Sequence, residues 1–227
     1  MSKLESTLQK IKPLDQEVMK KTQARLDSLT KPIGSLGVME EIAKKIAGIT
    51  GEVTPGIPQK AAILMAGDHG IVEEGVAPYP QEVTPQMVLN FVNGGAAMSV
   101  LTRHVGASLY VVDVGVAVDL PDEPNIIKKK VAYGTKNMAK GQAMTLEETV
   151  KAMEVGIDMA QEVIAKGAGI IGIGEMGIGN TSPSTAIASV YTGLPVSQVV
   201  GRGTGADDER MKIKSAAIEK AIEVNNP

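Results

Sequence analysis

The chain has 227 residues, a length sufficient for one sizeable domain with a small appendage. It carries 23 Lys and Arg against 26 Asp and Glu, a formal net charge of −3, which excludes the basic surface that binds nucleic acid or an anionic membrane. It has no cysteine, which excludes disulfides, thiolate catalysis, iron–sulfur clusters and Cys-ligated zinc. Its two histidines, His69 and His104, are too few for a His-rich metal site.

The first residues show no targeting signal. Residues 1–5 mix both signs of charge and are not followed by the apolar core of a signal peptide. The longest apolar stretches, such as residues 61–66, are much shorter than a membrane span. We therefore expect a cytoplasmic protein that does not insert into a membrane.

The first fifty residues predict helices. Residues 3–29 are rich in Lys, Gln, Glu and Leu and predict one helix, which ends before a turn marked by Pro32 and Gly34. Apolar residues at helical spacing predict a second helix over residues 36–49.

The middle of the chain predicts strands that alternate with helices. The continuous apolar run at 61–66 is typical of a strand that is buried on both faces, and residues 108–114 predict a second strand. Thr84 and Pro85 have the pattern of an N-cap followed by the first helical residue, and the pair Gly94 and Gly95 predicts a break in that helix.

The last third continues the alternation. Thr145 and Glu148 form a capping-box pattern before an amphipathic helix that Gly167 should end. The further predicted elements are a strand over 168–173, a helix over 182–191, a short strand ending at Gly201, and a last helix from Asp207 or Asp208 to Val224. Capped helices between buried strands predict an α/β fold with a doubly wound parallel sheet flanked by helices.

In such sheets, ligands bind beyond the carboxyl ends of the strands. Glycine is frequent in any strand-to-helix turn, but here every predicted strand exit is rich in glycine or carries polar side chains. The exits are residues 67–70, 113–115, 172–181 and 201–205.

The third exit excludes two nucleotide motifs and leaves an anion site. Gly172, Gly174 and Gly177 match the dinucleotide fingerprint, but no acidic residue lies between Glu175 and Asp207 to hold a ribose, which argues against NAD. Gly174 and Gly179 match the spacing of a Walker loop, but Asn180 and Thr181 follow where Lys and Thr are required. A backbone cradle for one phosphate or carboxylate remains, which favours a mononucleotide or a sugar phosphate.

Four ionisable residues near the exits have both a structural and a functional interpretation. Glu175 is either a solvated loop residue or a carboxylate that faces a developing cation or a substrate N–H. Asp68 and His69 are more simply explained by hydrogen bonds within the turn than by acid–base or metal chemistry. Lys214, on the last helix, is either a surface lysine or a point charge that reaches a bound phosphate.

Six segments together resemble one known family. They are RLDSLTKPIGSLG (25–37), MAGDHG (65–70), YPQEVT (79–84), GTKNM (134–138), GEMGIGNT (174–181) and GRGTG (201–205). The family is that of nicotinate-nucleotide–dimethylbenzimidazole phosphoribosyltransferases, which act in assembling the nucleotide loop of cobalamin. The resemblance runs from about residue 20 to the end of the chain and rests on long, specific motifs.

The resemblance implies a fold and a reaction. The fold is a Rossmann-like large domain, here residues 51–227, with a small helical domain built from both chain ends, of which residues 1–50 would supply the N-terminal part. The reaction transfers the 5-phosphoribosyl group of nicotinate mononucleotide to a nitrogen of 5,6-dimethylbenzimidazole, giving nicotinate and α-ribazole 5′-phosphate with inversion. The resemblance implies a homodimer, and because the pyridinium of the donor is already a good leaving group, we expect no cofactor and no metal.

The resemblance also assigns candidate residues. Glu175 matches a carboxylate that supports the base site, and Lys214 matches a lysine on the phosphate side. Pro80, Gln86 and Met176 are candidates for the pocket of the benzimidazole. The expected phosphate and ribose contacts are Gly174, Gly177, Gly179, Asn180, Thr181, Gly201, Gly203, Gly205 and Lys214.

One departure bears on activity. The family's general base is a glutamate in a further Gly-rich turn, which we expect to lie beyond Pro227, together with part of the sheet and half of the small domain. We therefore expect this polypeptide alone to have little or no activity.

Two alternatives remain open at this point. One is a non-catalytic protein that binds nicotinate mononucleotide or a benzimidazole. The other is a phosphoribosyltransferase that uses phosphoribosyl pyrophosphate, which requires paired acidic residues after a strand, whereas residues 111–114 offer only Asp113.

Overall fold

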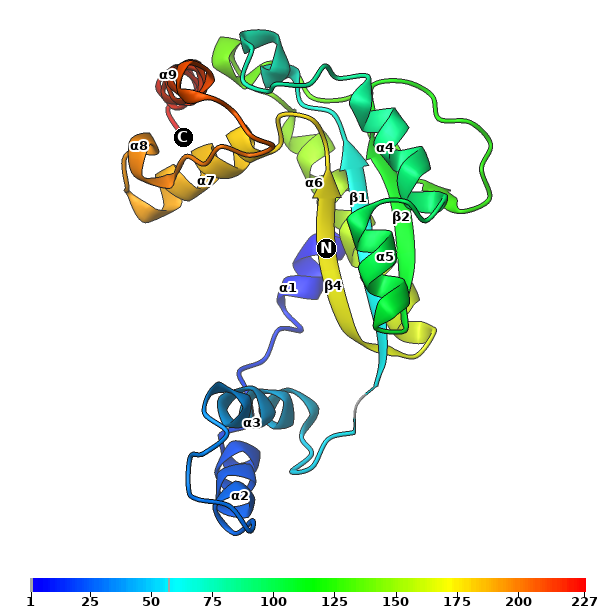
Figure 1. Ribbon diagram of the computed structural model, residues 1–227, viewed down its shortest axis with the longest axis vertical. Helices are drawn as coiled ribbons and strands as arrows, with labels where there is room; N and C mark the ends of the chain where they lie inside the picture. The colour runs from blue at the N-terminus through cyan, green and yellow to red at the C-terminus, as the bar shows by residue number, and fades with distance from the viewer. Residues whose placement is uncertain (1, 57) are drawn as a thin grey trace. The chain divides into compact units, whose positions relative to one another are not determined.

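The computed structural model describes residues 2–56 and 58–227, shown in Figure 1. The chain divides into two compact units, Met1–Pro58 and Gln59–Pro227. Among the described residues, no helix has both the length and the apolar character that crossing a membrane requires.

The first unit consists of helices. They are α1 (Lys3–Leu8), α2 (Gln16–Asp27) and α3 (Val38–Thr50), and α2 packs against α3. The prediction of one continuous helix over 3–29 is wrong. α1 already ends at Leu8, with Gln9 as its C-cap, and Pro13 keeps the chain from resuming the helix because it has no backbone N–H and disfavours helical geometry at Lys12. Asp15 then caps a new helix through the N–H groups of Glu17 and Val18.

The second unit is built on a four-stranded parallel sheet. Its strands are β1 (Gln59–Gly67), β2 (Ala107–Gly115), β3 (Ile126–Lys128) and β4 (Ala168–Met176), in the order β3-β2-β1-β4. The central strand β1 places Ile63 beside Tyr110 of β2 and beside Ile173 of β4.

Helices cover both faces of this sheet, as Figure 1 shows. On one face, α4 (Val83–Val92) and α5 (Ala97–His104) enclose a core that includes Leu64 and Ala66 of β1. On the other face, α6 (Leu146–Ala165) encloses a core that includes Ala61 and Ile63. Alternate side chains of one apolar strand therefore fill two cores, which confirms the predicted doubly wound α/β class.

Capping residues set the bounds of several helices as predicted. Thr145 and Glu148 form the capping box of α6, and the chain turns after this helix at Gly167, whose φ is +98°. α4 ends at Val92, before Gly94 and Gly95, and α5 starts beyond them. Asp207 caps the last helix, α9 (Asp208–Asn225), through the N–H of Arg210.

Thr84 does not have its predicted role. α4 begins at Val83, with Glu82 at the cap position, so Thr84 and Pro85 both lie in its first turn, where proline is tolerated. The side chain of Thr84 is buried, and its hydroxyl accepts the N–H of Ile178 at 3.1 Å. A residue expected to cap its own helix therefore holds a turn that is distant in sequence.

The fourth predicted strand is a helix. The sequence predicts that a strand ends at Val199 and Val200, but α8 spans Val196–Val199, so Gly201 follows a helix. The fourth strand of the sheet is instead β3, which the sequence analysis does not predict. The remaining elements are η1 (Gly70–Glu74), η2 (Met138–Lys140) and α7 (Thr181–Thr192).

Candidate active site

The ends of β1 and β4 define the position of the candidate site. The two strands pair in parallel from Gln59 beside Ala168 to Ala66 beside Met176, so they end at the same edge of the sheet. The chain leaves β1 toward α4 on one face and enters β4 from α6 on the other. The strand order therefore reverses between them, and ligands of open parallel sheets bind in the crevice beyond such a point.

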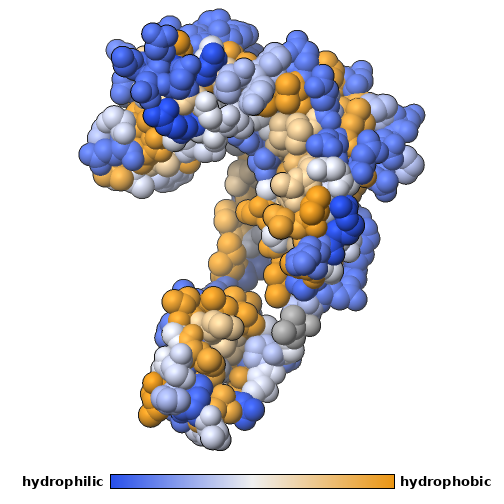
Figure 2. Space-filling view, viewed as in Figure 1, coloured by the Kyte–Doolittle hydropathy of each residue, from blue (hydrophilic) through white to orange (hydrophobic). Residues whose placement is uncertain are grey.

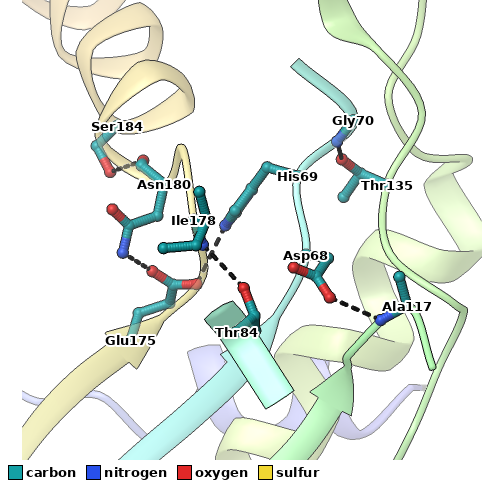
Figure 3. A network of polar contacts seen from close by, with 10 residues as sticks. All are labelled: Asp68, His69, Gly70, Thr84, Ala117, Thr135, Glu175, Ile178, Asn180 and Ser184. Atoms are coloured by element: carbon teal, nitrogen blue, oxygen red, sulfur yellow. Dashed lines mark hydrogen bonds and ion pairs between the residues drawn. The ribbon is translucent and has the colours of Figure 1, made fainter. Parts of the chain in front are cut away.

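A histidine and a glutamate meet across this crevice, as Figure 3 shows. His69 follows β1 and Glu175 is the penultimate residue of β4, and Nε2 of His69 lies 3.1 Å from Oε1 of Glu175. Asn180, just before α7, donates its side-chain N–H to Oε2 of the same carboxylate. Because an ionised carboxylate only accepts hydrogen bonds, we assign the proton of this contact to Nε2 of His69.

Because Gly177 has no side chain, His69 and Glu175 have room to contact each other. A Cβ atom at this position would lie 2.0 Å from the carbonyl oxygen of Gly67, 2.7 Å from Oε1 of Glu175 and 2.8 Å from Cδ2 of His69. The third glycine of the sequence motif is therefore required for close packing between the ends of β1 and β4.

The adjoining turn is fixed by packing. Gly179 has a φ of +86°, and a Cβ atom there would lie 2.7 Å from Cγ2 of Val72. With the hydroxyl of Thr84 holding the N–H of Ile178, this fixes the backbone that leads from β4 into α7.

Asp68 connects the loops behind this pair. Its Oδ2 accepts the N–H of Ala117 at 2.8 Å, and its carbonyl oxygen accepts the N–H of Thr135 at 3.0 Å. Asp68 is therefore hydrogen-bonded, but to two distant loops and not within its own turn as the simpler interpretation expected. That interpretation does not describe His69 either, whose ring nitrogen contacts a different strand.

A cavity of about 300 Å³ lies beside the pair, on the face of the sheet that α6 covers. Most of its wall is apolar, and Asp68, His69, Thr135 and Glu175 supply polar side chains to it. Its apolar lining residues are Met65, Ala66, Val114, Val131, Ala132, Met144 and Ala152.

Thr181, Gly201 and Gly203, three of the predicted phosphate residues, meet at a buried lysine. Lys214 of α9 is only 2% exposed, and its ammonium donates to Oγ1 of Thr181 at 2.7 Å and to the carbonyl oxygen of Gly201 at 2.8 Å. A Cβ atom at Gly203, whose φ is +58°, would lie 3.1 Å from Oγ1 of Thr181 and 3.5 Å from Nζ of Lys214. Two segments far apart in sequence thus meet at the start of α7.

The charge of Lys214 has no counter-ion among the side chains that the structure describes. Ion pairs form elsewhere in the chain, but none of those found in residues 2–56 and 58–227 includes Lys214. Burial lowers the pKa of Lys214 below its ordinary value of 10.5. A bound anion would offset this cost, and the neighbouring start of α7 favours negative charge.

Other predicted residues are placed differently. Gly174 lies within β4, where a Cβ atom would meet Met98 of α5 at 3.3 Å, so its small size serves packing. Gly205 is exposed and has no atom within 4 Å of its Cβ position. Glu175 lies in β4, which continues past the predicted end at residue 173.

The residues predicted to bind the base do not line the cavity. Pro80 and Gln86 are exposed, and Met176 packs against the core that α4 and α5 enclose, on the opposite face of the sheet. Their assignment to a base pocket stays a prediction.

One further residue has a role that sequence reasoning missed. Arg210 of α9 donates to the carbonyl oxygens of Gly75 and Ala77, at 3.2 and 2.6 Å. It ties the segment that leads to Pro80 to the same helix that carries Lys214. A lone arginine in a helix has no local pattern that would indicate such a contact.

Comparison with known proteins gives consistent matches. A family model described as phosphoribosyltransferase matches residues 11–227. The nicotinate-nucleotide–dimethylbenzimidazole phosphoribosyltransferase of Geobacter sulfurreducens is 53% identical over 227 residues, which cover all of this chain and 64% of that protein. The protein of the same name from Dehalococcoides mccartyi strain BAV1 is 54% identical over the same share of each chain.

Solved structures agree with these matches. A crystal structure of CobT from Thermus thermophilus superposes with a TM-score of 0.88 at 45% identity, covering 91% of this chain and 62% of that one. The chain thus spans about 64% of the length of the curated relatives named above.

Proposed function

Because this chain belongs to the phosphoribosyltransferase family, we propose that it takes part in transferring a phosphoribosyl group from nicotinate mononucleotide to 5,6-dimethylbenzimidazole. The products are nicotinate and α-ribazole 5′-phosphate. The names of relatives that are 53% and 54% identical support this choice of substrates. The motif residues at the ends of β1 and β4 lie where ligands of such sheets bind.

The observation that carries the proposal is the buried ammonium of Lys214. It is held by Thr181 and by the carbonyl of Gly201, beside the start of α7. A buried cation without a carboxylate partner favours an anionic ligand, and the 5′-phosphate of a mononucleotide is such a ligand. Gly201 has no atom within 4 Å of its Cβ position, so the main chain there is open to a close approach by a ligand.

The chemistry requires little from the protein beyond alignment. The bond from the anomeric carbon to the pyridinium nitrogen breaks, and its electrons neutralise the ring as nicotinate leaves. A lone pair on the imidazole nitrogen of the acceptor forms the new bond on the opposite face, and the acceptor then loses its N–H proton. Glu175, whose carboxylate is held at the crevice, is the residue we assign to accept a hydrogen bond from this N–H, and the proton itself goes to the family's general base, the glutamate expected beyond Pro227.

The homodimer and the cytoplasmic location belong to the same proposal. The first rests on the resemblance of the motifs, and the second on the composition of the chain.

The contacts of Asp113 argue against a reaction that uses phosphoribosyl pyrophosphate. Its carboxylate pairs with Lys130 at 3.0 Å and accepts the N–H of Val116 at 2.9 Å, and it is almost fully buried. A carboxylate engaged in this way is not available to ribose hydroxyls or to the magnesium ion that such a donor brings.

Calorimetric titration with nicotinate mononucleotide tests the proposal. We expect Lys214→Met to weaken binding by about 10- to 100-fold, the range for losing a hydrogen bond to a charged group. Lys212→Met is the matched control because Lys212 is exposed on the same helix. Lys214→Arg, which keeps the charge in a larger group, is expected to give intermediate binding.

The same samples, supplied with 5,6-dimethylbenzimidazole, are assayed for α-ribazole 5′-phosphate. Product formation together with the effect of Lys214→Met supports the transferase. Binding of both ligands with little or no product is the result expected of this polypeptide alone, because the family's general base is expected beyond Pro227, and the effect of Lys214→Met on binding then decides the phosphate site. Equal affinity of the wild type and Lys214→Met contradicts the phosphate site.

A further inference from the structure

The carboxylate of Glu175 is held from two sides. His69 contacts Oε1 and Asn180 contacts Oε2, as drawn in Figure 3, and no lysine or arginine in the described part of the chain pairs with it. The side chain of Glu175 is 40% exposed, and a free glutamate at that exposure samples many rotamers. Anchoring both oxygens selects one orientation at the rim of the cavity.

His69 is itself held in place by its backbone. The carbonyl oxygen of His69 accepts the N–H of Val72 at 3.1 Å, which starts η1. The next residue, Gly70, donates its N–H to Oγ1 of Thr135 at 3.2 Å, and a Cβ atom there would lie only 2.5 Å from the backbone of Lys136. The imidazole therefore extends from a segment fixed by the 134–137 loop and is only 19% exposed.

The two partners of Glu175 come from different parts of the chain: Asn180 from the same segment as Glu175, and His69 from the end of a different strand. Asn180 lies five residues further along the same segment, so its contact moves with the turn that carries Glu175. His69 comes from the end of β1, on the other side of the crevice, and its contact spans the point at which a ligand would enter. It is therefore the contact that sets the position of the carboxylate relative to the rest of the sheet.

We propose that His69 is a positioning residue, whose Nε2–H holds the Glu175 carboxylate in the orientation that receives the ring N–H of a nitrogen heterocycle. This inference rests on the proposed function, because it takes the acceptor base as the group that Glu175 meets. His69 acts through Glu175. Its contribution is to remove the rotamer freedom that the carboxylate would otherwise lose on binding.

Two amide variants test the proposal because they place a side-chain N–H donor at different distances from the backbone. The side-chain nitrogen of glutamine reaches the position of Nε2, whereas that of asparagine ends near the position of Nδ1. We expect His69→Asn to weaken binding of 5,6-dimethylbenzimidazole by about tenfold and His69→Gln to restore most of it. Binding of nicotinate mononucleotide, measured on the same samples, is expected to change less than about twofold and reports that the fold is intact.

A double-mutant cycle identifies the route of the effect. In a Glu175→Ala background, where the carboxylate is absent, His69→Asn is expected to cause no further loss of base affinity. A purely structural role for His69 would weaken both ligands and would persist in that background.

Each outcome decides the matter. Loss in His69→Asn, recovery in His69→Gln and unchanged nucleotide binding support the proposal. Base affinity in His69→Asn equal to that of the wild type overturns it and leaves the proposed function standing. A wild-type chain that binds neither nicotinate mononucleotide nor 5,6-dimethylbenzimidazole overturns the proposed function and this inference with it.

Discussion

The surroundings of Gly177 show how much of the candidate site depends on one absent methyl group. The residue lies where the carbonyl of Gly67, the ring of His69 and the carboxylate of Glu175 all approach its Cα. Tight backbone contacts of this kind cannot relax by rotating a side chain, since the nearest atom belongs to the main chain.

Gly177→Ala is therefore expected to lower the free energy of unfolding by about 3 kcal/mol, at the upper end of the usual cost of overpacking. The substituted methyl group would lie 2.0 Å from the carbonyl oxygen of Gly67 unless the ends of β1 and β4 separate. The measurement is the shift of the urea midpoint at unchanged slope.

A second glycine provides the control for this change. Gly156 lies in the middle of α6, with no atom within 4 Å of its Cβ position. Gly156→Ala is expected to raise the free energy of unfolding by about 0.5–1 kcal/mol, because alanine loses less backbone entropy in a helix. Similar losses in both variants would contradict the packing argument.

At the scale of elements, sequence patterns correctly predicted the features that depend only on residues close together in the chain. The capping box of Thr145 and Glu148, the glycine break after α4 and the apolar run of β1 each depend on residues adjacent in sequence. The edge of the sheet at which we expect ligands to bind was chosen from the alternation of strands and helices alone.

The predictions failed where contacts between residues distant in sequence determine the structure. Val199 and Val200 are β-branched, which is compatible with a short strand, but these residues find no strand to pair with in the described part of the chain, and α8 forms instead. β3 is three residues long, too short for a periodic pattern. The contact of His69 with Glu175 spans 106 positions of sequence, so no spacing rule could indicate it.

The tie between α9 and the 75–77 segment leads to a prediction at this scale. Arg210→Met removes two hydrogen bonds from a charged donor, and we expect the backbone amides of 75–77 to exchange with solvent about tenfold faster. Hydrogen exchange measured by mass spectrometry or NMR detects the change.

Lys212→Met, an exposed position on the same helix, serves as the reference and is expected to leave these amides unchanged. If exchange at 75–77 is as slow in Arg210→Met as in the wild type, other contacts hold the segment.

At the scale of the whole molecule, β4 is the feature open to other chains. It is an edge strand of nine residues, and no strand in residues 2–56 or 58–227 pairs with its outer side. Ile173 is 88% exposed and Ile170 is 44% exposed, and Figure 2 shows apolar residues gathered along this strand. A long apolar edge of this kind offers unpaired backbone groups to a second copy.

We expect the chain to self-associate with rising concentration and Ile173→Lys to reduce this association, because a charge on an edge strand opposes pairing. Sedimentation velocity over a concentration series measures it. Tyr191→Lys changes a residue of similar exposure, 87%, on a helix, and is expected to have a smaller effect. An equal reduction in both variants would assign the association to general surface hydrophobicity.

Helix α9 connects two regions of the molecule through neighbouring basic side chains. Lys214 and Arg210 lie one turn apart on it, one directed to the phosphate cradle and the other gripping the segment before Pro80. If binding of the donor at Lys214 shifts α9, the contacts of Arg210 carry that shift to residues 75–77. Thermodynamic linkage then makes the influence mutual: by whatever factor the bound nucleotide changes the affinity for the heterocycle, the bound heterocycle changes the affinity for the nucleotide by the same factor.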